Sequence, residues 1–223
     1  MGRLAVVLGS SALGPGGEAI AAAGAEHGAA IVQRHGARGY VLPHEIDHVA
    51  NLRALVEQGC DRVLAIASVG SLDAELPVGS LLCPDDFIAL HLGLSSFGDE
   101  RAHRAPRFDP VWREEVLAAW NAGPAKVRDG GVYWQAIGPR FETPAEIALM
   151  AAHADVVGMK IAAECIVAGE LGLSYAAVCV VDNLANGIGL EALSVEEMEG
   201  QRTLNIARLG DALDLVLPGL AGG

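Results

Sequence analysis

Short apolar runs, rich in branched residues, alternate along the chain with longer segments in which alanine, leucine and charged residues mix. Seven runs have the length and composition of buried strands: 4–9, 29–35, 61–71, 80–90, 131–138, 155–160 and 174–183. Five longer segments have the pattern of helices: 47–59, 110–120, 143–153, 161–172 and 194–217. Strands separated by helices are typical of a largely parallel sheet covered by helices.

Two of the predicted helices begin with a recognisable capping signal. Thr143 is followed by proline and then by Glu146, and Ser194 is followed three residues later by Glu197. Residues 92–109 form the one long polar segment between predicted elements. A loop of this size in a compact domain is usually a lid or a contact segment.

The length of 223 residues suits one α/β domain, and we expect residues 1–223 to form it. Apolar residues make up 52% of the chain and aromatic residues only 4%, which fits small side chains packed between helices and a sheet. The expected fold is therefore a single α/β domain with a central, mostly parallel sheet flanked by helices.

The formal net charge of −13 argues against nucleic acid or an anionic membrane as a partner. It also means that an anionic substrate must be held by a few local donors, because the overall field repels it. The four cysteines are scattered without a CxxC pair, which predicts buried thiols in a reducing cytoplasm. We expect no signal peptide, no membrane span and no metal site, because no segment has the required pattern.

Polar residues follow the first predicted strand. There the segment LGSSALG, residues 8–14, places Ser10 where its hydroxyl and backbone amide can face an anion. The segment is not a dinucleotide fingerprint, because it lacks the middle glycine of GxGxxG and no acidic residue ends the next strand. A plain connecting turn is the alternative interpretation.

Three further strands end in polar residues. Arg34 and His35 end the second strand, and a guanidinium suits phosphate, although such a pair is also common on surfaces. Ser68 lies near the end of the next strand in a small-residue turn, and Asn183 ends a long apolar strand where its amide can both donate and accept. Each signal alone also fits a simple turn. Together they mark one edge of the sheet, where ligands bind in α/β proteins.

The stretch GPRFETPAE, residues 138–146, contains two residues that helix capping does not explain. Thr143 and Glu146 account for the start of a helix. Phe141 and Glu142 lie before the cap, at the mouth of the turn, and have no such local role.

These segments resemble the trimeric purine nucleoside phosphorylase and methylthioadenosine phosphorylase family along nearly the whole chain. The matching blocks, in order, are LGSS, QRHG, LPHEIDHVANLRALVEQGCDRVLAIASVGSL, GPRFETPAE and DVVGMKIAAECIVAGELGLSYAAVCVVDN. The resemblance implies a homotrimer with active sites near subunit boundaries. It also implies phosphorolysis of a purine nucleoside to the free base and a ribose 1-phosphate, with inorganic phosphate as co-substrate and no resident cofactor.

The resemblance implies a role for each matching residue. The residues matched to phosphate contacts are Ser10, Arg34, His35, Ser68 and Lys160. The residues matched to the base and ribose are Tyr133, Phe141, Glu142, Met159, Asn183 and Val195. His103, in the long loop, is matched to a histidine that one subunit contributes to the active site of its neighbour.

Glu142 and Asn183 are the expected catalytic pair. Cleavage of the glycosidic bond leaves negative charge on the purine, and an amide at N7 and O6 would stabilise that charge. Glu142 would accept the N1–H of a 6-oxopurine, whereas the adenosine-preferring branch typically has Ser there and Asp in place of Asn183. A mismatch at that contact would cost about 1–3 kcal/mol.

The 5′ end of the nucleoside is expected to differ from that of inosine. The ordinary 6-oxopurine branch has a histidine in its C-terminal helix, whereas Val195 stands in the corresponding region here. An apolar residue suits a 5′-methylthio group, so the site residues look most like those of a methylthioinosine phosphorylase. Inosine or guanosine is the near alternative, and methylthioadenosine another.

Departures from the family pattern leave other mechanisms open. Lys160 replaces a Ser or Thr, Gly39 replaces a histidine and Ser11 replaces a glycine. Lys160 either binds phosphate or pairs with Glu164 one helical turn on. In a phosphate-independent nucleosidase, Glu164 would instead bind a ribose hydroxyl. A third interpretation is a purine-binding protein without turnover.

Overall fold

The structure, a computed structural model, describes residues 2–9, 15–36, 40–189 and 195–222; the side chains of 15–17, 19 and 195–199 are outside the description. The strands are β1 (Arg3–Leu8), β2 (Ala30–Gln33), β3 (Cys60–Ser71), β4 (Leu81–Cys83), β5 (Asp86–Ile88), β6 (Val127–Asp129), β7 (Val132–Gln135), β8 (Val156–Gly158) and β9 (Ser174–Leu184). The helices are α1 (Pro15–Glu26), α2 (His48–Glu57), α3 (Pro110–Ala122), α4 (Pro144–Ala151), α5 (Ile161–Leu171) and α6 (Val195–Ala221). Short 3₁₀ turns lie at Pro43–Glu45 and Glu100–Ala102.

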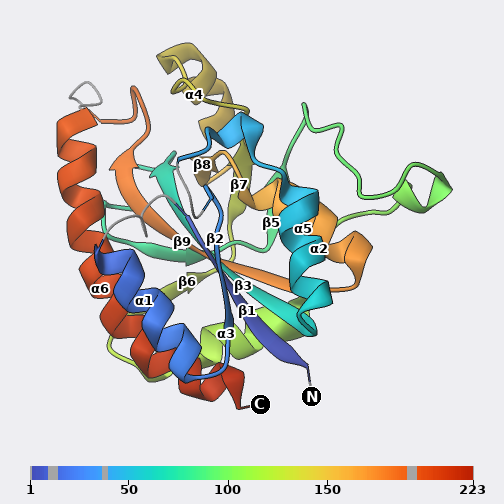
Figure 1. Ribbon diagram of the computed structural model, residues 1–223. Helices are drawn as coiled ribbons and strands as arrows, with labels where there is room; N and C mark the ends of the chain where they lie inside the picture. Colours follow the sequence, from blue (N-terminus) through green and yellow to red (C-terminus); the bar gives the residue numbers. More distant parts are fainter. Residues whose placement is uncertain (1, 10–14, 37–39, 190–194, 223) are drawn as a thin grey trace.

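One mixed sheet contains all nine strands described, and the long strands β3 and β9 form its centre (Figure 1). The strand order is β5-β7-β8-β3-β9-β4-β6, and β1 joins the N-terminal part of β3 and carries β2. Most pairs are parallel, whereas β8 with β3 and β4 with β9 are antiparallel. The expected mixed, mostly parallel sheet is confirmed.

Helices cover both faces of this sheet. Residues of α2 and α5 pack with the inner side chains of β1, β3 and β9 in one core cluster. Residues of α1, α3 and α6 pack in a second cluster on the opposite face, and α4 closes one end over β7 and β8 in a third (Figure 1). The two central strands are buried on both sides, which explains why they are almost continuously apolar in sequence.

Three helices start at the residues that their sequence signals indicate. The Asp47 carboxylate accepts a hydrogen bond from the Ala50 N–H at 2.8 Å, and Asp109 caps α3 in the same way. Thr143 and Glu146 form a complete capping box at α4. These caps fix where the preceding loops must end, and the loop before α4 contains Phe141 and Glu142.

The structure corrects three element predictions. Segment 80–90 is two strands, β4 and β5, because Pro84 has no N–H to continue a ladder. Helix α1 was not anticipated, since its glycines lower helix propensity; burial of Ile20 in the cluster with α6 compensates. Helix α6 continues past residue 217 to Ala221, where Leu220 is still buried. The predicted Ser194 cap lies outside the described residues.

The long loop 92–109 contains only the Glu100–Ala102 turn and extends beside α2 and α5 (Figure 1). Its base is fixed to α5, because the Glu170 carboxylate accepts hydrogen bonds from the Ser95 hydroxyl and from the Ser96 N–H and hydroxyl at 2.5–2.7 Å. All four cysteines are buried and unpaired. Among the described helices, none has the length and apolar character needed to cross a bilayer.

Candidate active site

A cavity of about 160 Å³ opens where β3 and β9 end, next to β8. Strand β3 contributes Ser68 and Gly70, and β9 contributes Asn183. The rest of the wall comes from β8, the loop before α4, the segment at residues 40–43 and α6. The carboxyl ends of the two central strands thus form the floor, which is the position where α/β sheets bind ligands.

Glu142 and Asn183 line this same cavity, although they are 41 residues apart in the sequence. Glu142 is only 8% exposed, and burial raises the pKa of its carboxyl group. The Asn183 Nδ2 donates to the Leu184 carbonyl at 2.8 Å. A side-chain carbon at Gly70 would lie 3.3 Å from that nitrogen, so glycine there lets the amide lie against β3. A carboxylate and an amide therefore share one hollow.

The GPRFETPAE stretch divides into a structural half and a cavity-facing half. The Arg140 guanidinium pairs with Glu146, which also completes the capping box of α4. Phe141 and Glu142 line the cavity, and the amide of Asn186 donates to the Glu142 carbonyl oxygen at 3.1 Å. Phe141 remains 43% exposed, so its ring is accessible at the cavity mouth.

Met159 and Lys160 follow β8 and also line the cavity. Gly138 has φ of 72°, and a side-chain carbon there would come within 2.6 Å of the Met159 sulfur. Lys160 is only 7% exposed, and burial lowers the pKa of its ammonium group to about 8. Its side chain has no hydrogen bond or ion pair with the rest of the described chain.

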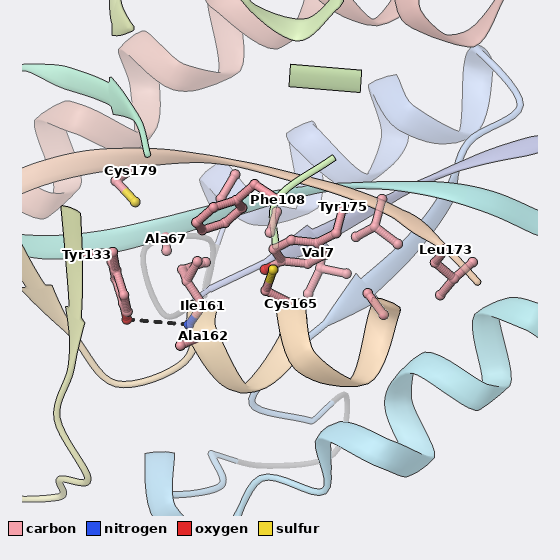
Figure 2. Packing of buried hydrophobic residues seen from close by; sticks show 14 of the residues in the cluster. Val7, Ala67, Phe108, Tyr133, Ile161, Ala162, Cys165, Leu173, Tyr175 and Cys179 are labelled. Atoms are coloured by element: carbon pink, nitrogen blue, oxygen red, sulfur yellow. Dashed lines mark hydrogen bonds between the residues drawn. The ribbon is translucent and has the colours of Figure 1, made fainter. Parts of the chain in front are cut away.

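Tyr133, expected near base or sugar, is instead a buried support. Its side chain is fully buried and does not line the cavity. Its hydroxyl accepts a hydrogen bond from the backbone N–H of Ile161 at 3.3 Å (Figure 2). It also accepts one from the backbone N–H of Lys160 at 3.0 Å, at the start of α5. Gly158 makes room for it, since a side-chain carbon there would lie 2.5 Å from the hydroxyl. Tyr133 positions the turn that carries Lys160.

Arg34, expected to face phosphate, is buried and ion-paired with Glu164. Its Nε and Nη2 donate to the two Glu164 oxygens, and its Nη1 donates to the Ile66 carbonyl at 3.1 Å. Arg34 is not among the residues that line the cavity. The structure thus places this cation behind the site, within hydrogen-bond range of β3 and α5.

The Glu164 carboxylate is bound by Arg34, so of the two alternatives left open for Lys160, the pair with Glu164 is not the one that the structure shows. It also accepts a hydrogen bond from the Tyr175 hydroxyl at 2.7 Å, and it does not line the cavity. Burial acts to raise the pKa of Glu164, but the charge and hydrogen bonds of Arg34 bring that pKa well below its ordinary value. The nucleosidase interpretation required Glu164 to bind a ribose hydroxyl. The structure does not place the carboxylate where it could do so.

His35 lies beside the cavity rather than in its wall. Its Nδ1 is 2.8 Å from the Val41 carbonyl oxygen, and its ring stacks on Tyr40, which does line the cavity. Burial, together with the charge of Lys160, lowers the pKa of His35 to about 4. A neutral ring that donates from Nδ1 leaves Nε2 as an acceptor, and this buried atom has no partner among the described residues.

The remaining predicted residues fall into three groups. Ser68 lines the cavity, and its side chain acts to lower the pKa of Asp182, which burial raises. His103 is exposed in the long loop and is not part of the cavity wall. Ser10 lies outside the described residues, and Val195 begins α6 with its side chain outside the description.

Sequence reasoning missed Arg202, which reaches the cavity from α6. The buried face of α6 runs through Asn205, Leu209, Ala212 and Leu213. Arg202 continues this face by one more step of three residues, so a cation stands where the helical period predicts a core residue. A charged residue at a position where the helical pattern predicts an apolar one is therefore the signal in the sequence that could have identified Arg202.

A family model described as "Phosphorylase superfamily" matches residues 17–218. A probable 6-oxopurine nucleoside phosphorylase of Archaeoglobus fulgidus is 43% identical over 170 residues, which cover 76% of this chain and 70% of that protein. A probable S-methyl-5′-thioinosine phosphorylase of Methanothermobacter thermautotrophicus is 35% identical over 171 residues, covering 76% of this chain and 60% of its own length.

A more complete match and a solved structure agree with these. A probable 6-oxopurine nucleoside phosphorylase of Moorella thermoacetica is 32% identical over 243 aligned positions, which cover 98% of this chain and 93% of that protein. Methylthioadenosine phosphorylase from Schistosoma mansoni, solved with adenine, superimposes with a TM-score of 0.82 at 19% identity, over 100% of this chain and 93% of that one. At this identity the likeness concerns the fold.

Proposed function

The chain belongs to the phosphorylase superfamily, and from this premise we propose that it cleaves 6-oxopurine nucleosides with inorganic phosphate. The products are the free purine and ribose 1-phosphate, or its 5-methylthio derivative. One observation carries the proposal: Glu142 and Asn183 line a single cavity whose wall also contains the aromatic ring of Phe141 and the ammonium group of Lys160. A purine, its ribose and an anion each have a matching group there.

The amide and the carboxylate act on the departing base. As the bond from C1′ to N9 breaks, its electron pair moves onto the purine ring. The Asn183 amide faces N7 and O6 and stabilises the charge that develops there. The Glu142 carboxylate accepts the N1–H, which 6-oxopurines have and 6-aminopurines lack. The ring of Phe141 packs on the base from the cavity mouth.

Phosphate completes the substitution at the sugar. A phosphate oxygen attacks C1′ as N9 leaves, so one C–O bond forms while one C–N bond breaks, and the purine takes up a proton. Lys160 has no ion-pair partner among the described residues, and its charge suits the phosphate. Ser68 and the acceptor nitrogen of His35 lie on the same side of the site in this proposal, and Ser10 is a further candidate. Arg34 acts only by holding Glu164 and β3.

The 5′ substituent is proposed to be methylthio, with hydroxyl as the near alternative. Two kinds of relatives match this chain, named for 6-oxopurine nucleosides and for S-methyl-5′-thioinosine. Val195, at the start of α6, and Met159 are the apolar residues assigned to that end of the nucleoside. The choice of methylthio over hydroxyl rests on the sequence, in which Val195 stands in the region where the ordinary 6-oxopurine branch has a histidine.

A substrate panel tests the proposal. Inosine, guanosine, adenosine and their 5′-methylthio forms are each incubated with and without phosphate, and base release is followed. We expect release of hypoxanthine and guanine only when phosphate is present, with the adenine compounds slower by about 5- to 150-fold. Release without phosphate would identify a nucleosidase instead. Preference for methylthioadenosine would identify a methylthioadenosine phosphorylase, and binding without release would identify a purine-binding protein.

The proposal extends to the assembly and the cellular setting of the protein. We propose a homotrimer in which the loop 92–109 contacts a neighbouring copy and supplies His103 to its site. Four buried, unpaired thiols suit the reducing cytoplasm, where a purine salvage enzyme would work. Phosphate is the co-substrate, and no resident cofactor or nucleic-acid or membrane partner is proposed.

A further inference from the structure

Two cationic side chains line the cavity from opposite layers of the fold. Lys160 stands at the N-terminus of α5, between β8 and that helix, and Arg202 lies on α6. Within the described chain, neither side chain has a hydrogen bond or an ion pair. Both are close enough to Asp182 for their charges to lower the pKa of its carboxyl group.

Asp182 does not neutralise this pair. Its Oδ1 accepts a hydrogen bond from Asn205 of α6 at 2.7 Å, and the Ser68 side chain acts to lower the pKa of the same carboxyl group. Burial raises the pKa of Asp182 and so disfavours its charge. Among the described residues, two cations therefore lie near one carboxyl group that Asn205 of α6 already binds.

Two cations in the wall of one cavity are unexpected in a chain with a formal charge of −13. Lys160 is almost completely buried, and burying a cation without a partner is unfavourable, so this pair is expected to meet an anion. The cation that the family resemblance assigns to phosphate, Arg34, is already bound by Glu164 behind the cavity wall. The anion-binding charge that faces the cavity thus comes from Lys160 and Arg202.

We propose that Lys160 and Arg202 together bind a phosphate dianion in this cavity, with Arg202 as a specificity-determining residue supplied by α6. Arg202 offers a planar fork that suits two phosphate oxygens, and Lys160 offers a compact charge beside them. The inference rests on the proposed function for the presence of a nucleoside next to the anion. The dianion is either inorganic phosphate or the 5′-phosphoryl group of a purine nucleotide, because the chemistry recognised is the same.

Calorimetric titration of the full-length protein tests this independently of turnover. Inorganic phosphate, inosine and inosine 5′-monophosphate are titrated into the parent and into Arg202→Gln and Lys160→Gln. If inorganic phosphate is the ligand, both variants lose about 10-fold or more in phosphate affinity, the loss typical of one charge-assisted hydrogen bond. If the nucleotide is the ligand, the parent binds inosine 5′-monophosphate more tightly than inosine, and each variant removes that preference.

Controls separate a binding role from a structural one. Arg208→Gln, on the exposed side of the same helix, should leave all three affinities within about 2-fold of the parent, and Arg202→Lys should recover part of the phosphate affinity. Thermal unfolding checks that each variant folds, and Arg202→Ala replaces the Gln variant if that one does not. Phosphate and nucleotide affinities unchanged in folded Arg202 variants would overturn the inference. Anion binding that depends on Arg202, in a parent that cleaves no nucleoside, would refute only the proposed function.

Discussion

The guanidinium of Arg34 is held by both carboxylate oxygens of Glu164, 130 residues further along the chain. The pair joins the end of β2 to α5, and both side chains are almost completely buried. Tyr175 of β9 donates to the same carboxylate. This contact connects two strands of the sheet with α5, and it makes Arg34 a structural residue.

Loss of one partner should therefore destabilise the protein. Glu164→Ala leaves a buried guanidinium without its counter-charge, and we expect the free energy of unfolding to fall by about 3–5 kcal/mol. Urea denaturation followed by circular dichroism measures this. Asp99→Ala removes the exposed pair with Arg101 and should leave the midpoint unchanged. Equal, small effects of both substitutions would contradict the structural role of Glu164.

The selectivity for the base should depend on Glu142. Glu142→Ser removes the acceptor for N1–H, and we expect the ratio of kcat/KM for inosine over adenosine to fall by about 5- to 150-fold. Glu115→Ser, an exposed glutamate of α3, is the matched control and should keep the parental ratio. A parental ratio in the Glu142 variant would remove this residue from base recognition.

Acid should weaken the same selectivity. Burial raises the pKa of Glu142 above its ordinary value, so the carboxylate takes up a proton as the pH falls through that raised pKa. A protonated Glu142 no longer favours an N–H donor at N1. We expect the inosine-to-adenosine ratio to decline on acidification in the parent and to be flat in Glu142→Ser. A decline of the same size in both proteins would assign the effect to another group.

The rate should depend on the amide of Asn183. Asn183→Ala removes the donor to the developing purine anion, and kcat/KM for inosine should fall about 100-fold or more. Steady-state rates at saturating phosphate measure this. Asn121→Ala, at the end of α3, changes an amide that bonds only to the backbone N–H of Val127 and should keep the parental rate. An unchanged rate in the Asn183 variant would take that residue out of the chemistry.

Phosphate binding should weaken in alkali because Lys160 loses its proton. The pKa of Lys160 is lowered to about 8, so the side chain is charged below that pH and neutral above it. We expect KM for phosphate to rise as the pH passes through about 8, while KM for inosine at saturating phosphate changes little. Lys160→Arg keeps its charge in this range and should flatten the profile. A rise of the same size in that variant would exclude Lys160 as the titrating group.

The features that were predicted correctly from the sequence are those defined by local patterns along the chain. The apolar runs predicted the central strands, and the strand-end residues Ser68 and Asn183 do line one cavity. Glu142 was singled out because capping left it without a local role, and it lines that cavity as well. These inferences succeeded because a strand end or a helix cap is a local property.

What the sequence missed depends on partners that are distant along the chain. Nothing near Arg34 reveals that Glu164 will bind it, and nothing near Tyr133 reveals that its hydroxyl will accept hydrogen bonds from the backbone at the start of α5. Arg202 belongs to a helix whose contact with β9 only the tertiary fold defines. Helix α1 was not predicted because its glycines lower helix propensity. Its packing against α6, which stabilises the helix, is a contact that the local sequence does not reveal.

The most direct test of the central claim is a crystal structure of the protein with hypoxanthine and phosphate bound. We predict that the purine lies in the cavity with N1 within hydrogen-bond distance of the Glu142 carboxylate and N7 facing the Asn183 amide. We also predict phosphate beside Lys160. Hypoxanthine bound elsewhere, or bound in this cavity with its N1 edge turned away from Glu142, would contradict the account.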